Sequence, residues 1–494
     1  MRKTAGFTWC FRQMLFQLSY FLAICEFLRY GSVCSAKQTY SEGGPRSRFE
    51  STFDKTCSKY PFVSQYLANL EAPAQRFIIF VFDERGVKNG GLGDRLGGMI
   101  TAIAFALRTR RTLLISADKA FEAAFTPYHP NNNGSYLWGN WGWSGYLDEY
   151  NHGGNIIQLR NCVNSRNTKC CLDDDVKEKV VRYISNRAYL CRWVVKPDLY
   201  NNSNLERLGI TADTDLFEAA GCMLRLAMWP TEIFWNSIDN SMENQLKSLN
   251  NQFSITSYQL GFHFRCGDKS FGNDATANLM NSECYFNSSL PWVGTNFLDD
   301  MSMESPRDLG VCGAKILKNL KNSNPELSKH AMVYIASDNH YSAQQINTTI
   351  NYPIVFLPPK VCHVEMNAKF ECTVSTLLHW FILSLSDRIV MQTLIPPDYN
   401  HTYYNPDMHH HNSQAQSALS KYGVLPSNSG LVSLNSGHLD QNFSAPISAF
   451  SRFAVIYSLH NNAAVFGLSC NNGSKTAMSK HTQGNWLCDP SHLF

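Results

Sequence analysis

The sequence predicts an α/β protein of two domains that follows an amino-terminal targeting segment. Its 494 residues exceed what one ordinary hydrophobic core organises. Residues 76–116 have the pattern of a strand, a glycine-rich loop, a helix and a strand, which is a βαβ unit. Residues 258–265 alternate with the two-residue period of a strand, and residues 331–336 have the composition of a further, buried strand.

The composition excludes one broad class of partner. Hydrophobic residues make up 44% of the chain and charged residues 17%, as in globular proteins. The net charge of +3 is small, and no concentrated stripe of lysine and arginine with interleaved aromatic residues is present in the sequence. We therefore expect no nucleic-acid partner.

Residues 1–36 have the pattern of a targeting segment. Arg2, Lys3 and Arg12 precede the apolar stretch Met14–Leu28, and small residues follow up to Ser35. The segment is either a signal peptide cut near Ser35 or an uncleaved signal anchor with its amino end in the cytosol. Both interpretations place the rest of the chain in the lumen of the secretory pathway.

The cysteines agree with an oxidising compartment. Thirteen of the 16 cysteines lie between Cys57 and Cys488, and no C-x-x-C spacing occurs. This pattern argues against structural zinc and favours disulfides, although the sequence does not give their pairing.

The chain then divides into three further parts. Residues 37–74 are polar and rich in serine, glycine and arginine, so we expect a stem or lead-in. Residues 75–255 are assigned to a first α/β domain and residues 256–494 to a second one.

The first domain opens with the βαβ unit. An apolar strand spans residues 76–82, and the loop Gly90–Gly98 leads into a helix whose apolar residues recur at helical spacing. Residues 112–116 form the next strand. A glycine-rich loop entering a helix presents backbone N–H groups and the positive end of the helix dipole, so it suits an anion. A tight strand-to-helix turn explains the same glycines.

The stretch around residue 260 organises the second domain. Gln259, Gly261, His263 and Arg265 share one face of the predicted strand, and the chain becomes polar directly afterwards, at Asp268–Lys269. These side chains therefore lie at the carboxyl end of a strand, where ligands bind in open α/β sheets. The planar, permanently charged guanidinium of Arg265 suits a diphosphate. The alternative is a solvated arginine and a half-buried structural histidine.

Two further segments carry candidate polar groups. The strand over residues 331–336 ends at Ser337-Asp338, where a carboxylate accepts two hydrogen bonds from a guanine edge or caps the following helix. A helix is expected from Ser448, its cap, to about Leu459, and its amide groups together with the Ser451 hydroxyl suit a phosphate oxygen. Between these segments lie a helix that follows Glu371 and a strand over residues 388–391.

Four stretches occur in one order: GGLGDRLGGMITAIAFALRTRRTLLI, GFHFRCGDKSFGNDA, VYIASDNHYSA, and SDRIVMQT followed at a distance by SAFSRFAVIY. As an ordered set they resemble the fucosyltransferase superfamily of the GT-B type, which has two facing Rossmann-like domains. The spacing G-x-H-x-R-x-x-D-K is most similar to the α1,6-fucosyltransferase branch. The resemblance covers roughly residues 75–120 and 255–460.

The resemblance implies a reaction. It implies an inverting transfer of fucose from GDP-fucose to a hydroxyl of a glycan or glycoprotein, without metal or another cofactor. The first domain would face the acceptor and the second would bind the nucleotide. With the targeting segment, it predicts a single-pass type II protein of the Golgi membrane, or a secreted protein after cleavage.

The resemblance also implies residue roles. Arg265 would bind the β-phosphate, and His263 and Asp338 would hold the guanosine. Ser448 or Ser451 would add phosphate contacts.

In the first domain, Gly91 and Gly93 would let the chain close over the nucleotide. The base of the α1,6 branch falls at Asn273 without a gap, and Asn273 cannot accept a proton. One inserted residue aligns Asp274 instead, with Lys269 in its usual place. The acceptor and the linkage do not transfer, because a long insertion separates Gln392 from Ser448.

Two other functions stay open. A metal-dependent transferase of another fold would use an Asp-x-Asp motif, at residues 173–175 or 213–215, but helix caps explain both because helical patterns follow. No spacing completes a metal site around His409–His411. The other alternative is a catalytically inactive luminal sugar-binding protein, which Asn273 favours.

Overall fold

The computed structural model describes a large part of the chain between residues 45 and 466. The described residues are 45–71, 76–82, 91–128, 156–160, 178–185, 206–211, 213–248, 258–264, 302–303, 306–337, 340–357, 370–391, 394–395, 449–459 and 464–466. Within these ranges no helix combines the length and the apolar character that crossing a membrane requires. The predicted targeting segment, residues 1–36, lies outside them.

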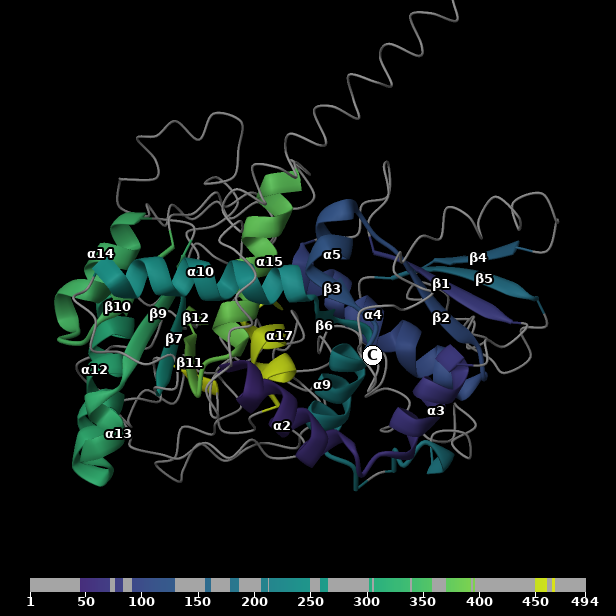
Figure 1. The fold of residues 1–494 in the computed structure, drawn as a ribbon, viewed down its shortest axis with the longest axis horizontal. Coiled ribbons are helices and arrows are strands. Elements are labelled where there is room, and N and C mark those ends of the chain that lie inside the picture. The colour runs from purple at the N-terminus through teal and green to yellow at the C-terminus, as the bar shows by residue number, and fades with distance from the viewer. Residues whose placement is uncertain are drawn as a thin grey trace, which may run out of the picture.

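The amino-terminal part of the fold contains a four-stranded parallel sheet (Figure 1). Its strands are β1 (Phe77–Val81), β2 (Thr112–Ser116), β4 (Ile156–Arg160) and β5 (Val180–Ile184), in the order β2-β1-β5-β4. Helix α4 (Leu92–Arg108) connects the paired strands β1 and β2. The predicted βαβ unit is therefore confirmed.

Helix α4 is buried almost all round. Sixteen of its 17 residues are buried, because strands β1 and β2 lie against one side and other helices against the other. A side chain at Gly98 would collide with the sheet, since an added Cβ atom would lie 1.8 Å from the Ser185 carbonyl oxygen. Packing therefore explains why position 98 is a glycine: without a side chain there, α4 can approach the end of β5 closely.

A second sheet has five strands, all parallel. They are β7 (Gln259–Phe264), β9 (Met332–Ser337), β10 (Ile354–Val355), β11 (Arg388–Met391) and β13 (Ala464–Phe466), in the order β10-β9-β7-β11-β13. Two short antiparallel pairs complete the strands, β3 (Phe125–Thr126) with β6 (Trp229–Pro230) and β8 (Ser302–Met303) with β12 (Leu394–Ile395). The α/β class with parallel sheets is confirmed.

Helices cover both faces of the five-stranded sheet. On the outer face, α12 (Pro306–Ser323) and α14 (His340–Thr349) pack on β7 and β9, and the short α13 (Pro325–Lys329) follows α12. Leu260, Phe262 and Phe264 belong to this outer core. The inner face carries α15 (Phe370–Ser384) and α17 (Ala449–Ser458). The predicted alternation along β7 is confirmed, because Gly261 lies against Ser386 of the inner layer.

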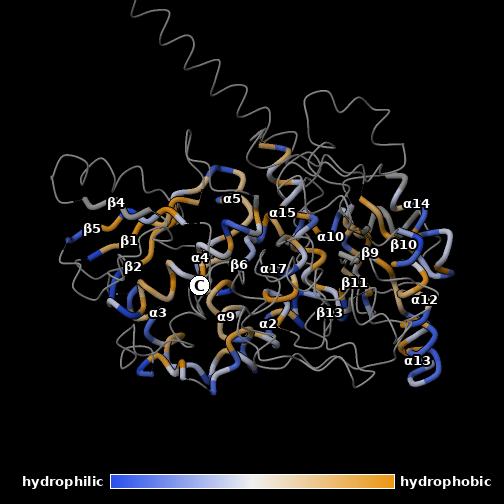
Figure 2. The backbone as a smooth tube through the Cα atoms, turned by 180° about the vertical axis from the view of Figure 1, so that it is seen from behind, coloured by the Kyte–Doolittle hydropathy of each residue, from blue (hydrophilic) through white to orange (hydrophobic). Residues whose placement is uncertain are grey.

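The layer between the two sheets is helical. It contains α5 (Lys119–Ala124), α9 (Leu216–Ala227) and α10 (Glu232–Ser248), and α15 and α17 pack against these helices and α4. One cluster of buried apolar side chains runs from β1 through these helices to β9 and β11. In Figure 2 the strand β1 is largely hydrophobic, whereas α13 at the edge of the molecule is largely hydrophilic.

Residues 37–74, expected to be a stem, contribute two helices to this core. They are α2 (Pro45–Cys57) and α3 (Pro61–Glu71). Phe49, Phe53 and Cys57 are buried at four-residue spacing, so α2 has one apolar stripe on an otherwise polar helix. The sequence prediction missed this stripe because most residues of the segment are polar. Residues 45–71 at least are thus part of the folded domain and not a stem.

Disulfides are present, as the cysteine pattern predicted. Cys57 of α2 is bonded to Cys222 of α9, with 5.5 Å between their Cα atoms. Cys312 of α12 and Cys372 of α15 are disulfide-bonded as well. Such bonds persist in oxidising compartments.

Candidate functional site

The order of the strands selects one edge of the five-stranded sheet. Within this sheet, β7 is the first strand in the sequence. The chain then adds β9 and β10 on one side of β7, and afterwards β11 and β13 on its other side. Numbered along the chain, this order is 3-2-1-4-5, which is the doubly wound nucleotide-binding order 3-2-1-4-5-6 without its sixth strand. The direction reverses between β7 and β11. Ligands in such sheets bind outside the carboxyl ends of the strands at this reversal.

His263 lies at that point. It is level with Met391 of β11 on one side and with Ala336 of β9 on the other. Phe264, the last residue of β7, is level with Ser337 at the end of β9. His263 is 8% exposed and Ser337 is 4% exposed, so both side chains are held within the fold at this edge.

The first turn of α17 covers the carboxyl end of β7. The ring of Phe450 stacks on His263 with 4.9 Å between ring centroids and 23° between ring planes. Ser451 follows and is 1% exposed. The amide groups of a first helical turn have no partner within the helix, and the dipole adds partial positive charge there. This end of α17 is therefore electrostatically suited to an anion at the edge of the sheet.

Helix α15 also begins near this edge. Its carboxyl end lies at the start of β7, because the Gln259 Nε2 atom donates to the Ile382 carbonyl and to Ser386 Oγ, each at 2.9 Å. Its first turn therefore points toward the carboxyl edge of the sheet. There Thr373 is 2% exposed, and its hydroxyl has no hydrogen-bond partner among the described residues.

A buried polar pair fastens α15 to the sheet below the site. The Tyr334 hydroxyl of β9 and His379 Nδ1 of α15 are 2.8 Å apart. Burial lowers the pKa of His379 to about 4 and raises the pKa of Tyr334 well above its ordinary value. His379 is therefore neutral at physiological pH. In the tautomer with its proton on Nε2, Nδ1 accepts from the phenol.

The glycines predicted to approach a nucleotide lie at the start of α4. Gly91 is the cap residue, and its N–H group donates to Asp94 Oδ2 at 3.1 Å, while Gly93 is buried. The Asp94 carboxylate thus already compensates the positive end of α4. This arrangement favours a structural turn, and a contact of Gly91 and Gly93 with a nucleotide stays a prediction.

Five of the predicted site residues lie outside the described residues. These are Arg265, Lys269, Asp274, Asp338 and Ser448. Arg265 directly follows Phe264 in the sequence, and Ser448 directly precedes α17. The structure therefore brings together two of the predicted residues, His263 and Ser451, at one edge, and the roles of all seven stay predictions.

Sequence reasoning missed two side chains at this edge, Phe450 and Thr373. Phe450 stands inside the SAFSRF stretch, between the two serines that were selected for their hydroxyl groups. Only the fold shows that its ring meets His263. Thr373 carries no sequence signal, because a threonine in the first turn of a helix is common.

One of the two Asp-x-Asp motifs, at residues 213–215, lies at the start of a helix. Asp215 caps α9, where its Oδ1 atom accepts from the Glu218 amide at 3.0 Å, as the helical pattern predicted. Residues 173–175 and 409–411 lie outside the described residues. Among the residues that the structure describes, no group of three histidine, cysteine, aspartate or glutamate side chains is placed to hold a metal ion.

Comparisons with solved structures give distant similarities to fucosyltransferases. A mutant of Arabidopsis thaliana FUT1 in complex with GDP is 14% identical, with a TM-score of 0.32, over 70% of this chain and 74% of that one. The fucosyltransferase NodZ from Bradyrhizobium is 16% identical, with a TM-score of 0.30, over 64% of this chain and 87% of that one. No protein-family model matches the chain, and no curated protein does.

Proposed function

We propose that this protein is a glycosyltransferase that moves fucose from GDP-fucose to a hydroxyl group of a glycan or glycoprotein, with inversion and without a metal ion. One observation carries the proposal. The strand that ends in the GFHFRCGDK stretch is β7, the strand from which the five-stranded sheet reverses its direction. A cation that follows this strand would lie where α/β sheets bind nucleotides.

The proposed chemistry needs stabilisation of a leaving diphosphate. The acceptor hydroxyl attacks the anomeric carbon, the bond from that carbon to the GDP oxygen breaks, and negative charge develops on the diphosphate. Arg265 and the first-turn amides of α17 would stabilise this charge. A single displacement inverts the configuration at the anomeric carbon.

The acceptor must also lose a proton. Asp274 is the carboxylate that the motif alignment offers as a base, with Lys269 five residues before it in the sequence. The proton would pass from the acceptor hydroxyl to this carboxylate while the new glycosidic bond forms.

The guanosine would lie along the edge formed by β7 and β9. His263 would contact it beside the Phe450 ring, and Asp338, which follows Ser337 of β9, would accept from the guanine edge. Ser448 and Ser451, at the start of α17, would contribute to the phosphate site.

The proposed location is the lumen of the secretory pathway, in the Golgi membrane through residues 1–36. The disulfides of Cys57, Cys222, Cys312 and Cys372 support an oxidising compartment. If the amino-terminal segment is cleaved, the same protein would be secreted.

Turnover tests the proposal. A secreted form from residue 37 onward, which keeps α2 and α3 intact, is incubated with GDP-fucose, GDP-mannose or UDP-sugars and a panel of glycan acceptors, and nucleotide release is measured. We expect GDP release from GDP-fucose, unchanged by a chelator. Loss of activity with chelator would favour the metal-dependent class, and GDP-fucose binding without release would favour the sugar-binding protein.

A further inference from the structure

Helix α2 lies across the boundary between the two sheets (Figure 1). Near its start, Arg48 forms an ion pair with Asp387 at 3.3 Å. The Asp387 carboxylate also accepts from the Gln259 amide at 2.7 Å, at the beginning of β7. Helix α2 therefore reaches the amino-terminal edge of the five-stranded sheet, the edge opposite the candidate site.

The next residue, Phe49, enters the helical layer between the sheets. Its ring centroid lies 5.0 Å from Trp229, 5.6 Å from Phe381 and 5.7 Å from Tyr457. These partners belong to β6, α15 and α17. A single side chain of α2 thus contacts elements that precede β7 in the sequence and elements that follow it.

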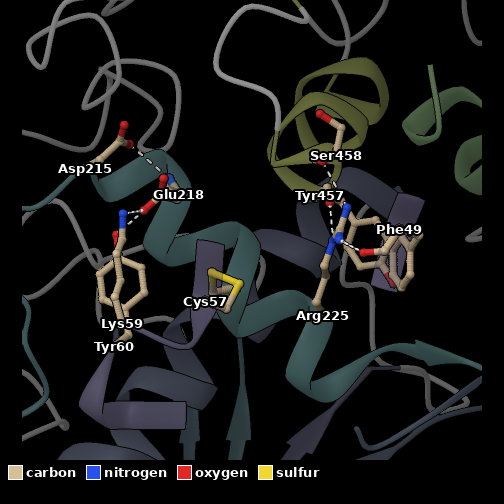
Figure 3. Close-up of a disulfide and its surroundings, with 10 residues drawn as sticks. Phe49, Cys57, Lys59, Tyr60, Asp215, Glu218, Arg225, Tyr457 and Ser458 are labelled. Atoms are coloured by element: carbon tan, nitrogen blue, oxygen red, sulfur yellow. Dashed lines mark hydrogen bonds and ion pairs between the residues drawn. A yellow bond between two sulfur atoms is a disulfide. The ribbon is translucent and has the colours of Figure 1, made fainter. Parts of the chain in front are cut away.

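Arg225 joins three helices at the same point (Figure 3). It donates to the carbonyl oxygens of Phe49, Tyr457 and Ser458 at 2.7, 2.8 and 2.9 Å. Its guanidinium carbon lies 3.9 Å from the centroid of the Phe49 ring. Because the last carbonyl groups of a helix have no partner within it, Arg225 caps the carboxyl end of α17 and holds α2 against it.

At the carboxyl end of α2, the disulfide between Cys57 and Cys222 also links this helix to α9. Cys222 lies three residues before Arg225 on α9, so both face α2, and Cys222 is bonded to Cys57 (Figure 3). Both cysteines are 0% exposed. Beyond the disulfide, the Tyr60 hydroxyl donates to Glu218 of α9 at 2.7 Å.

We propose that α2, closed by the Cys57–Cys222 bond and by Arg225, is a brace that fixes α17 between the two sheets and thereby holds one wall of the candidate site. The carboxyl end of α17 is held by Arg225, and its amino end presents Phe450 to His263. Loss of the brace therefore loosens a site at the far end of α17.

Amide hydrogen exchange tests the brace without reference to any ligand. In Cys57→Ala/Cys222→Ala, which leaves neither bonded cysteine as a free thiol, we expect exchange in residues 449–458 to rise about tenfold while residues 306–323 of α12 stay protected. Unchanged exchange in α17, or an equal rise in α12, would overturn the proposal. Glu326→Gln, which removes the exposed pair with Lys329, serves as the control.

A second variant tests the brace even if the double cysteine mutant does not fold. Arg225→Lys keeps the charge but loses the fork that reaches three carbonyl groups, so we expect the same selective loss of protection in α17. Selective loss supports the brace, and a profile like that of the Glu326→Gln control contradicts it.

A GDP titration of the same variants links the brace to the site and rests on the proposed function. We expect weaker GDP binding in the variants whose α17 exchanges faster. If the parent protein binds no GDP, the proposed function fails while the exchange result still decides on the brace. If the parent binds GDP and all variants bind equally, the link between the brace and the site is wrong.

Discussion

Phe450 stacks on His263, with 4.9 Å between their ring centroids, and so places the start of α17 on the carboxyl end of β7. The two residues come from segments far apart in the sequence and meet at the point where the five-stranded sheet reverses direction. The start of α17, the end of β7 and the His263 imidazole therefore lie together at this edge of the sheet.

Replacing Phe450 with alanine removes this stack. A ring pair contributes about 0.5–1.5 kcal/mol beyond its buried area, so we expect GDP affinity to fall about 2- to 10-fold if His263 contacts the guanosine. Isothermal titration calorimetry measures the change. Phe450→Tyr, which keeps the ring, is the control and should bind as the parent does. Equal affinities in all three proteins would show that the stack does not support the nucleotide site.

Replacing Gly221 with alanine should destabilise the protein. An added Cβ atom would lie 2.3 Å from the Ile456 carbonyl oxygen and 2.5 Å from Leu459 Cδ2, so α9 and α17 would have to separate. We expect a loss of about 1–3 kcal/mol in the free energy of unfolding. Denaturant unfolding measures it. Asn322→Ala on the exposed face of α12 should change stability by less than about 0.5 kcal/mol.

Stability should fall on acidification because His379 is buried in its neutral form. The folded pKa of about 4 is below the ordinary value of 6.5, so the unfolded chain binds this proton first. The contribution is complete above pH 6.5 and is lost as the pH falls toward 4, by about 3 kcal/mol in all. Denaturant unfolding at several pH values gives the free energy of unfolding as a function of pH. Between pH 6.5 and 4, this free energy should fall less for His379→Gln than for the parent. If His379→Gln loses as much stability as the parent over this pH range, the assignment to His379 is wrong.

Asp215 should behave as a helix cap. Asp215→Ala loses the bond to the Glu218 amide, so we expect about 1 kcal/mol lower stability, whereas Asp215→Ser keeps an acceptor and most of the stability. Thermal unfolding and GDP release are measured together. A metal ligand would instead lose activity in both variants and regain part of it at high concentrations of divalent metal.

Much of the fold follows from short-range patterns. The strand over residues 112–116, the alternation along β7 and the helix that ends near Leu459 all agree with the sequence prediction. Leu459 has a positive φ of 62°, as the residue after a helix often has. Local periodicity is sufficient in these segments because each buries one continuous face.

Other features depend on contacts between distant segments, which one sequence does not reveal. Helix α2 has only three buried residues in a polar stretch, and its packing depends on Arg225 and on Cys222. For the candidate site, the sequence predicted a strand that ends near residue 264 and a helix that begins near residue 449, and the structure confirms these two elements. The sequence did not reveal that Phe450 lies against His263, because that contact depends on the order of the strands.

Arg265 directly follows β7 in the sequence, and we propose that its guanidinium binds the diphosphate of GDP. Calorimetric titration of GDP into the parent and into Arg265→Ala tests it most directly, with Arg307→Ala on the exposed face of α12 as the matched control. A charge-assisted hydrogen bond contributes about 1.5–3 kcal/mol, so we expect GDP to bind Arg265→Ala about 10- to 100-fold more weakly than the parent and the control. Equal GDP affinity of all three proteins would contradict the proposed site.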